Sequence, residues 1–418
     1  MIKKKIYSLV KKFTDTNSKK KINRNFLNLS SPIFDHKEIN NLISSLLGGW
    51  ISLGPKVKTF EKRFSKKIGC KYGIATNSGS SANLIVLEAL KKKYKLKKGD
   101  EVILPAATFA TVVTPIIQVG LKPVFVDVDL QTLNISPDEI QKAITKKTKI
   151  LLIVHTLGHS AEMHKILNIA KKNKIIIFED CCEAHGSKLK NKFTGSWGVI
   201  SAFSFFVAHN MTTGEGGMIC TSDKELKDLC ISYREFGRIK QAKSITGRFY
   251  SNRNLKNYDR RYVFENIGYN MRMNDLSASL GIEQLKKLDK FNLKRIQNAK
   301  YLFLQLKKNF SKYFLFPAMV FDNSNTFYTF PILIKPKTKI NRKDLCIFLE
   351  KNKIETRPMM AGCLTDQPAL KNINYKITGN LKNSKIIRDR VFFVGIHPLL
   401  NKENFNYFIK ILKKFLKK

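Results

Sequence analysis

Short apolar runs alternate with helix-length amphipathic segments between residues 71 and 223. Strands that are apolar along their whole length are buried on both faces, so the alternation predicts a mostly parallel sheet covered by helices. The helical segments repeat their apolar residues every three or four positions. The predicted strands lie within 71–78, 100–106, 122–129, 149–158, 174–187, 200–206 and 216–223, and the predicted helices within 80–95, 136–148 and 161–173.

The pattern changes in the second half of the chain. Asn274 is predicted to cap a long helix that begins with residues 275–291, because Asn favours the N-cap and the residues after it have helical spacing. A smaller α+β region follows, with a strand within 326–336 and a last helix within 404–418. Residues 239–262 have no clean period and are predicted to form a long loop over a binding site or an interface.

The N-terminal end stands apart from the rest of the chain. Apolar residues at helical spacing, with lysines between them, predict an amphipathic helix. We interpret it as a helix packed on its own domain or on a partner subunit; contact with a membrane surface is the less favoured alternative. The apolar residues are Ile2, Ile6, Leu9, Val10 and Phe13. The predicted organisation is a basic extension over 1–32, a large cofactor-binding α/β domain over 33–285 and a small α+β domain over 286–418.

The large net charge does not by itself identify a nucleic-acid-binding protein. The chain has 76 Lys and Arg against 32 Asp and Glu, a formal net charge of +44. The lysines are spread along the chain without an arginine-rich stripe, RNA-binding aromatics or zinc-finger spacing, which argues against a specific nucleic-acid partner. A positive surface does favour an anionic substrate such as a nucleotide sugar.

Cysteine usage and hydropathy indicate the compartment. The seven cysteines have no CxxC spacing, so we expect buried thiols rather than a metal site or a redox pair. No apolar run is long enough to span a bilayer, and the N-terminus has no apolar stretch followed by a cleavage site. We therefore expect a cytoplasmic protein without a bound metal.

Three short motifs carry chemistry that suits a phosphate-bearing ring. Residues Thr76–Asn83, "TNSGSSAN", place glycine and hydroxyls before a helix, where free N–H groups can hold a phosphate. Asp180 ends a strand and can pair with a protonated ring nitrogen, and Phe109 can stack on a flat ring. Each motif alone is explained as well by an N-cap, a turn residue or a core aromatic. Their order before Ser204–Gly217, "SFFVAHNMTTGEGG", is far more specific.

Several segments resemble the DegT/DnrJ/EryC/StrS family of nucleotide-sugar aminotransferases, from about Ile33 to the C-terminus. The resemblance implies fold type I of the pyridoxal-phosphate enzymes, an α/β fold with a three-layer αβα large domain, a mostly parallel sheet and a smaller C-terminal α+β domain. The segments are "WISLGPKVKTFEKRF", "SGSSANLIVLEAL", "GDEVILPAATFATV", "PVFVDVD", "EDCCEAHGS", "TTGEGG" and "GYNMRMNDLSASLGIEQL".

One residue distinguishes this chain from the aminotransferases of the family. These carry a lysine immediately before an asparagine and a "TTGEGG"-like turn, and His209 occupies that position here. Together with "EDCC", "HTLG" and "AGCLTDQPA", the substitution is similar to the dehydratase branch, whose members are 3-dehydratases of CDP-4-keto-6-deoxyglucose or GDP-4-keto-6-deoxymannose. A lysine bonds covalently to the cofactor and passes amino groups on, whereas imidazole only moves protons.

The resemblance therefore implies a lyase that removes the C3 hydroxyl of a nucleotide-linked 4-keto-6-deoxy sugar, as in dideoxysugar synthesis for lipopolysaccharide or O-antigen. The cofactor would be pyridoxamine 5'-phosphate or pyridoxal 5'-phosphate, with His209 as the base. Gly79, Ser80 and Ser204 would hold its phosphate. Family members are homodimers with shared sites, and Asn270 would reach the phosphate in the partner subunit.

The remaining contacts that the resemblance implies surround the cofactor ring. Asp180 would face the pyridine nitrogen, Phe109 would stack on the ring, and Glu183 would lie near the ring hydroxyl. Three histidines stay without a role, of which the last is expected nearest the cofactor: His155, His159 and His185.

The CDP-linked dehydratase binds a [2Fe-2S] cluster through cysteines in the loop that follows a "GR" dipeptide. Residues 239–262 contain no cysteine, so we expect no [2Fe-2S] cluster and favour hydrolytic release with re-amination from glutamate. Two alternatives stay open: an aminotransferase with another amine donor, and a catalytically degenerate, basic binding protein. The nucleotide and the hexose also stay open.

Overall fold

The computed structural model describes residues 2–18, 23–239, 249–250, 255 and 257–417. Its centre is an eight-stranded sheet in the order β1-β9-β8-β5-β4-β2-β3-β15. β9 runs antiparallel to both neighbours and the other pairs are parallel, which confirms the predicted sheet. The strands are β1 (Tyr72–Thr76), β2 (Glu101–Pro105), β3 (Lys122–Val126), β4 (Thr148–Val154), β5 (Ile176–Asp180), β8 (Ile200–Ser204), β9 (Gly217–Thr221) and β15 (Lys376–Ile377).

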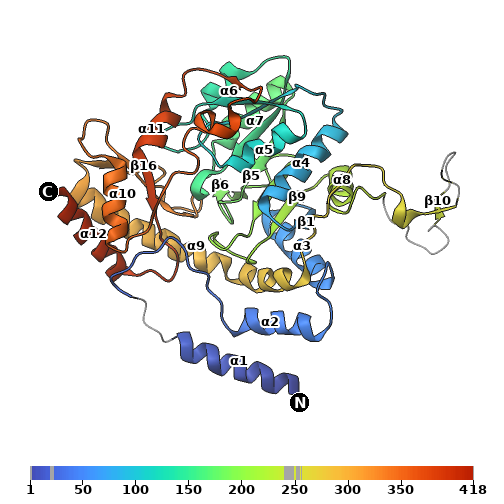
Figure 1. Ribbon diagram of the computed structural model, residues 1–418, viewed down its shortest axis with the longest axis horizontal. Helices are drawn as coiled ribbons and strands as arrows, with labels where there is room; N and C mark the ends of the chain where they lie inside the picture. Colours follow the sequence, from blue (N-terminus) through green and yellow to red (C-terminus); the bar gives the residue numbers. More distant parts are fainter. Residues whose placement is uncertain (1, 19–22, 240–248, 251–254, 256, 418) are drawn as a thin grey trace.

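Helices cover both faces of this sheet in three layers (Figure 1). Successive strand residues point to opposite faces, so Val102 and Leu104 join one core while Ile103 joins the other. The first face carries α4 (Gly79–Lys93), α5 (Ala110–Gln118) and α8 (Lys224–Arg234), and the second carries α3 (Pro55–Ile68), α6 (Pro137–Ala143), α7 (Met163–Asn173) and the first part of α9 (Asp275–Phe310).

Side-chain caps fix where the elements nearest the cavity begin and end. The Ser78 hydroxyl accepts the Ser81 N–H at 3.1 Å and starts α4. The predicted cap of α9 is confirmed, because Asn274 Oδ1 accepts the Ser277 N–H at 2.8 Å. β5 ends before the predicted 174–187 segment does, since Asp180 Oδ1 accepts a backbone N–H two residues ahead and turns the chain.

A second core lies in the C-terminal part of the chain. The second half of α9 buries Leu302, Leu306 and Phe310 against a four-stranded antiparallel sheet in the order β12-β13-β16-β14. The expected domain boundary between residues 285 and 286 falls inside α9, so one helix contributes to both cores. The elements are β12 (Phe314–Leu315), β13 (Phe330–Ile334), α10 (Arg342–Lys351), β14 (Thr356–Pro358), α11 (Lys382–Arg390), β16 (Val391–Val394) and α12 (Lys402–Leu416).

Smaller elements lie at the periphery. α1 (Ile2–Ser18) lies along α2 (His36–Leu47), with the Asn40 amide donating to the Tyr7 carbonyl at 3.5 Å, so the predicted packing of this helix on its own domain is confirmed (Figure 1). None of the helices in the described ranges has the length and apolar content to cross a bilayer. Of the predicted 239–262 loop, residues 240–248, 251–254 and 256 lie outside the described residues. Two short hairpins complete the chain: β6 (Lys188–Leu189) with β7 (Lys192–Phe193), and β10 (Phe249–Tyr250) with β11 (Tyr258–Asp259).

Candidate active site

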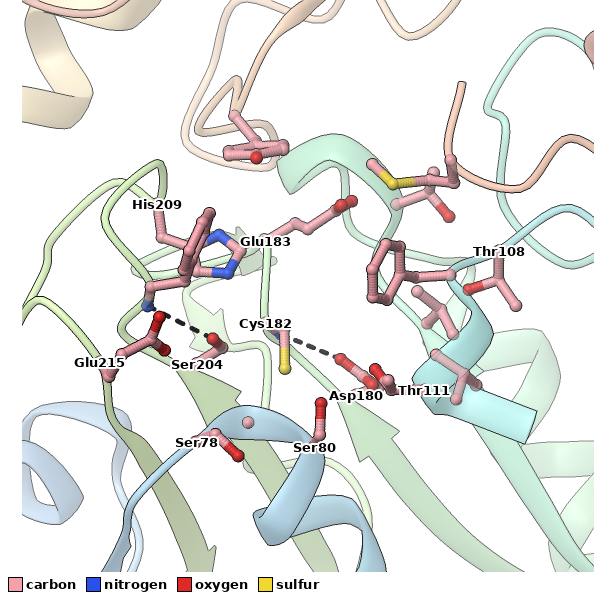
Figure 2. A pocket seen from close by; sticks show the side chains of 18 residues that line it. Ser78, Ser80, Thr108, Thr111, Asp180, Cys182, Glu183, Ser204, His209 and Glu215 are labelled. Carbon is pink, nitrogen blue, oxygen red and sulfur yellow. Dashed lines mark hydrogen bonds between the residues drawn. The ribbon is translucent and has the colours of Figure 1, made fainter. Parts of the chain in front are cut away.

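A cavity of about 300 Å³ opens where the carboxyl ends of β4, β5 and β8 meet the N-termini of α4 and α5. Parallel strands bring their carboxyl ends to one edge of a sheet, and ligands of open α/β folds bind at this edge. Figure 2 shows His209 and Glu183 on one side of the cavity and Ser78 and Ser80 at its base. The lining residues are Ser78, Gly79, Ser80, Thr108, Phe109, Thr111, Val112, Val154, Thr156, Asp180, Cys182, Glu183, Ser204, Phe206, His209, Glu215, Tyr328 and Met360.

The floor of the cavity, formed by the first turn of α4, is suited to binding an anion. The N–H groups of Gly79 and Ser80 are in the first turn of α4, where they have no acceptor within the helix. A Cβ on Gly79 would lie 2.5 Å from the Cβ of Ser204, so only glycine allows α4 to approach β8 this closely. The Ser204 hydroxyl adds a third polar group, and the helix dipole favours negative charge at this end.

Asp180 provides a fixed carboxylate at the end of β5. Its side chain is buried, and its two oxygens accept hydrogen bonds from the Asn83 amide at 2.8 Å and from the Cys182 N–H at 3.0 Å. Figure 2 shows the second of these bonds. Within the described ranges, no cation forms a salt bridge with this carboxylate. A buried carboxylate at this position can therefore pair with a protonated ring nitrogen.

Phe109 is the N-cap residue of α5. Its side chain is 54% exposed and lines the cavity, whereas the residue considered alone favours a core aromatic. A large apolar ring exposed in a cavity is well placed to stack on a flat ligand. The structure thus brings together the anion-binding base, the carboxylate and the aromatic face that the sequence motifs suggested separately.

Glu183 is an acid that burial keeps protonated. Removal from water raises its pKa to about 8; a hydrogen bond from the Leu157 N–H at 2.7 Å lowers the value somewhat and the Asp180 charge raises it again. Near neutral pH the side chain is therefore a neutral carboxylic acid. It can both accept the backbone hydrogen bond and donate one to an oxygen of a ligand.

His209 lies half-buried on the same side of the cavity as Glu183, on the loop after β8. Its ring centroid lies 5.2 Å from that of Tyr328 and 5.7 Å from that of His185. Its Nδ1 atom has no hydrogen-bond partner among the described residues. Burial lowers the pKa of His209 well below its ordinary value, and the neighbouring His185 and Arg295 lower it further, so the imidazole is neutral and able to accept a proton at pH 7.

A buried amide network holds the loop that carries this histidine. The Asn210 amide donates to Asn292 Oδ1 at 2.9 Å and to the Thr326 carbonyl at 3.1 Å. From α9, the Arg295 guanidinium donates to the Tyr328 carbonyl at 2.8 Å. The loop and Tyr328 are therefore both fixed against α9, which positions the two rings relative to each other.

Some sequence candidates lie away from the cavity. Asn270 is exposed, does not line the cavity and accepts a hydrogen bond from Arg272 Nε at 3.1 Å. His155 is buried behind the sheet edge and pairs with Glu179 at 2.9 Å, and His159 is buried beside the Asn134 amide. His185 is closer, as expected, but it packs behind His209 and does not line the cavity.

Other lining residues were missed by the sequence motifs. Ser78 and Cys182 lie within the motifs "TNSGSSAN" and "EDCC" but were given no role of their own. Tyr328 and Met360 come from the C-terminal part of the chain, and Met360 directly precedes the segment "AGCLTDQPA", but neither residue was assigned to the cavity. Only the packing of the two cores brings them to the site.

The chain is similar in sequence and in structure to several known proteins. The chain is 36% identical over 397 residues to the lipopolysaccharide biosynthesis protein RfbH of Salmonella typhimurium, covering 92% of this chain and 91% of the relative. It is 35% identical over 392 residues to GDP-4-keto-6-deoxy-D-mannose 3-dehydratase of Yersinia pseudotuberculosis, covering 92% and 98%. The structure is similar to that of the E. coli GDP-4-keto-6-deoxy-D-mannose-3-dehydratase with bound hydrated PLP, with a TM-score of 0.86, 33% identity and coverage of 94% and 100%.

The residues of the cavity fit pyridoxal or pyridoxamine phosphate, the cofactor of this group of proteins. The fit rests on the close approach at Gly79, the carboxylate of Asp180 without a cation, and the exposed ring of Phe109. The sequence profile of the DegT/DnrJ/EryC1/StrS aminotransferase family matches residues 32–413, and the solved relatives share the fold expected for type I enzymes that use this cofactor. The chain belongs to the DegT/DnrJ/EryC1/StrS family.

Proposed function

We propose that this protein is a 3-dehydratase that removes the C3 hydroxyl of a nucleotide-linked 4-keto-6-deoxyhexose, in dideoxysugar synthesis for lipopolysaccharide or O-antigen. One observation carries the proposal: His209 faces the cavity at the family's lysine position, and the described lining residues include no lysine. Without an amine the loop cannot bond to the cofactor, so it can transfer protons but not amino groups. The name of the Salmonella relative supports the pathway.

Each part of the cavity has one task in this proposal. The N–H groups of Gly79 and Ser80 and the Ser204 hydroxyl hold the cofactor phosphate, while Asp180 orients the ring through its nitrogen. Phe109 covers one face of the ring and excludes water from it. When bound, pyridoxamine phosphate supplies the amine that condenses with the C4 ketone of the sugar and the ring that accepts electrons.

His209 moves the proton. Its neutral imidazole would accept a proton from the cofactor and substrate bound beside it, which is the general-base role that elimination of the C3 hydroxyl requires. Because the pKa of His209 is lowered, its imidazole stays neutral and able to accept a proton well below neutral pH. Glu183, protonated near neutral pH, donates a hydrogen bond to the hydroxyl oxygen of the cofactor ring. Because it is neutral, it adds no negative charge beside that oxygen.

Turnover is proposed to use glutamate. Loss of the C3 oxygen is a two-electron reduction of the sugar, and oxidation of glutamate to 2-oxoglutarate with release of ammonia balances it. The absence of cysteine from residues 239–262 supports this route over a cluster-linked reductase. A relative in this group has been solved with a trapped PLP-glutamate geminal diamine.

We further propose a homodimer with shared sites. Asn270 is exposed and lies outside its own cavity, as expected of a side chain that completes the phosphate site of a partner subunit. A second function, amino transfer to the sugar, is supported by the description of the family as aminotransferases. It requires an amine carrier other than the residue at position 209.

Borohydride treatment separates the two functions. The protein is loaded with pyridoxal phosphate, reduced, denatured and examined by mass spectrometry. We expect an unmodified chain, since no lysine lines the described cavity. A chain heavier by one reduced cofactor, with the label on a single lysine peptide, would support the aminotransferase instead.

A further inference from the structure

Helix α1 presents an apolar stripe to solvent. Ile2, Leu9 and Phe13 are 78%, 59% and 69% exposed. Their spacing of seven and then four residues puts them on one side of a helix. Ile6 and Val10 are half-buried, so a different side of α1 makes the contact with α2. The stripe is therefore not the surface that attaches α1 to the domain.

Lysines border this stripe. The helix has five lysines and one acidic residue, so it is strongly basic. Lys5 and Lys12 lie next to the stripe on the helical wheel, whereas Lys4 and Lys11 lie on the opposite side of the helix. All four are exposed. An apolar stripe with lysines along its edge is the pattern of a helix that lies in the plane of a membrane surface.

The position of α1 at the edge of the molecule agrees with a role apart from the cavity. The family match begins at residue 32, so α1 lies outside the matched region. Figure 1 shows α1 beneath α2 at the edge of the molecule, where a flat surface can approach it. Its attachment includes a hydrogen bond from Asn40 and contacts with α2.

We propose that α1 binds the surface of anionic phospholipid bilayers. Ile2, Leu9 and Phe13 enter the boundary between headgroups and acyl chains, while the lysines meet the lipid phosphates. A second copy of the chain is a poorer occupant, since its α1 would bring like charges together and a single row of three side chains is small for a stable protein interface. The inference holds whatever reaction the cavity catalyses.

Sedimentation with vesicles tests the proposal on the full chain. We expect binding to phosphatidylcholine vesicles that contain phosphatidylglycerol, much weaker binding to phosphatidylcholine alone, and release by high salt. Replacing Ile2 and Leu9 together by Gln is expected to lower the partition coefficient about tenfold or more. Replacing Lys5 or Lys12 by Gln is expected to lower it about fivefold each.

A matched control uses two leucines with similar exposure elsewhere. Leu293 and Leu304 on α9 are 56% and 54% exposed, and their double Gln variant is expected to bind vesicles like the unchanged protein. Equal binding of the Ile2/Leu9 variant would overturn the proposal, as would no binding of the unchanged protein to anionic vesicles. Loss of self-association in the Ile2/Leu9 variant, measured by light scattering without lipid, would assign the stripe to a second copy instead.

Discussion

Glu183→Gln is expected to change how the stability of the cofactor-free protein depends on pH. Burial raises the pKa of Glu183 to about 8 from an ordinary 4.5. Between these two values the folded protein keeps a proton that the unfolded chain releases. Stability rises with pH only where the unfolded chain binds more protons, so this group makes stability fall as pH rises from 4.5 to about 8.

The size of the effect follows from the linkage relation. A full proton difference changes the free energy of unfolding by about 1.4 kcal/mol per pH unit, or about 2.7 kcal/mol between pH 5 and pH 7. Glu183 lies in an open cavity, so screening by water reduces this to about 1–2 kcal/mol. The glutamine variant keeps the acceptor for the Leu157 N–H and has no proton to release.

Urea unfolding at pH 5, 6, 7 and 8 measures the difference. We expect the variant to gain stability over the unchanged protein as pH rises, with most of the gain between pH 5 and pH 7. Glu215→Gln removes a carboxylate from the same cavity and reports the effect of charge removal alone. Parallel pH profiles for Glu183→Gln and the unchanged protein would show that this carboxyl group is ionised at neutral pH, contrary to the raised pKa.

Three other results are expected. His209→Lys should bind pyridoxal phosphate covalently, so that borohydride fixes the cofactor to the chain, and should lose most C3 deoxygenation; an unlabelled chain would count against the placement of this residue. Arg295→Met should move the acid limb of the kcat/KM profile to higher pH, because removing the nearby positive charge raises the pKa of His209. Arg295→Lys keeps the charge and should move the limb less. If the acid limbs of all three proteins coincide, Arg295 does not affect the pKa of His209. The His209→Asn and Asn270→Ala variants should each be nearly inactive alone. When their subunits are mixed at random, half of the dimers are mixed dimers with one intact site of two, so about a quarter of full activity should return. No recovery after confirmed subunit exchange would contradict a site shared between subunits.

The fold was largely predictable because its signals are local. Apolar runs with helices between them gave the parallel sheet, and the motifs at the strand ends gave the base of the cavity around Gly79 and Asp180. The resemblance to a family then added the fold type. The antiparallel direction of β9 had no comparable signal, because a strand buried on both faces has the same composition in either direction.

The rest of the site depends on packing that the sequence does not encode locally. Tyr328 and Met360 reach the cavity only because α9 joins the two cores. Phe109 is exposed because the turn before α5 directs it into the cavity, although its residue type favours the core. The raised pKa of Glu183 results from burial, which no motif reports.

The most direct test of the account is the fate of the oxygen at C3. The purified protein is incubated with pyridoxamine phosphate, glutamate and CDP-, GDP- or dTDP-4-keto-6-deoxyhexoses, and the sugars are examined by mass spectrometry beside those from His209→Asn. We predict a product that lacks one oxygen atom with at least one of these sugars, and a rate about 10²–10⁴-fold lower for the variant. A product in which nitrogen replaces the C4 oxygen, or a His209→Asn variant as fast as the unchanged protein, would contradict it.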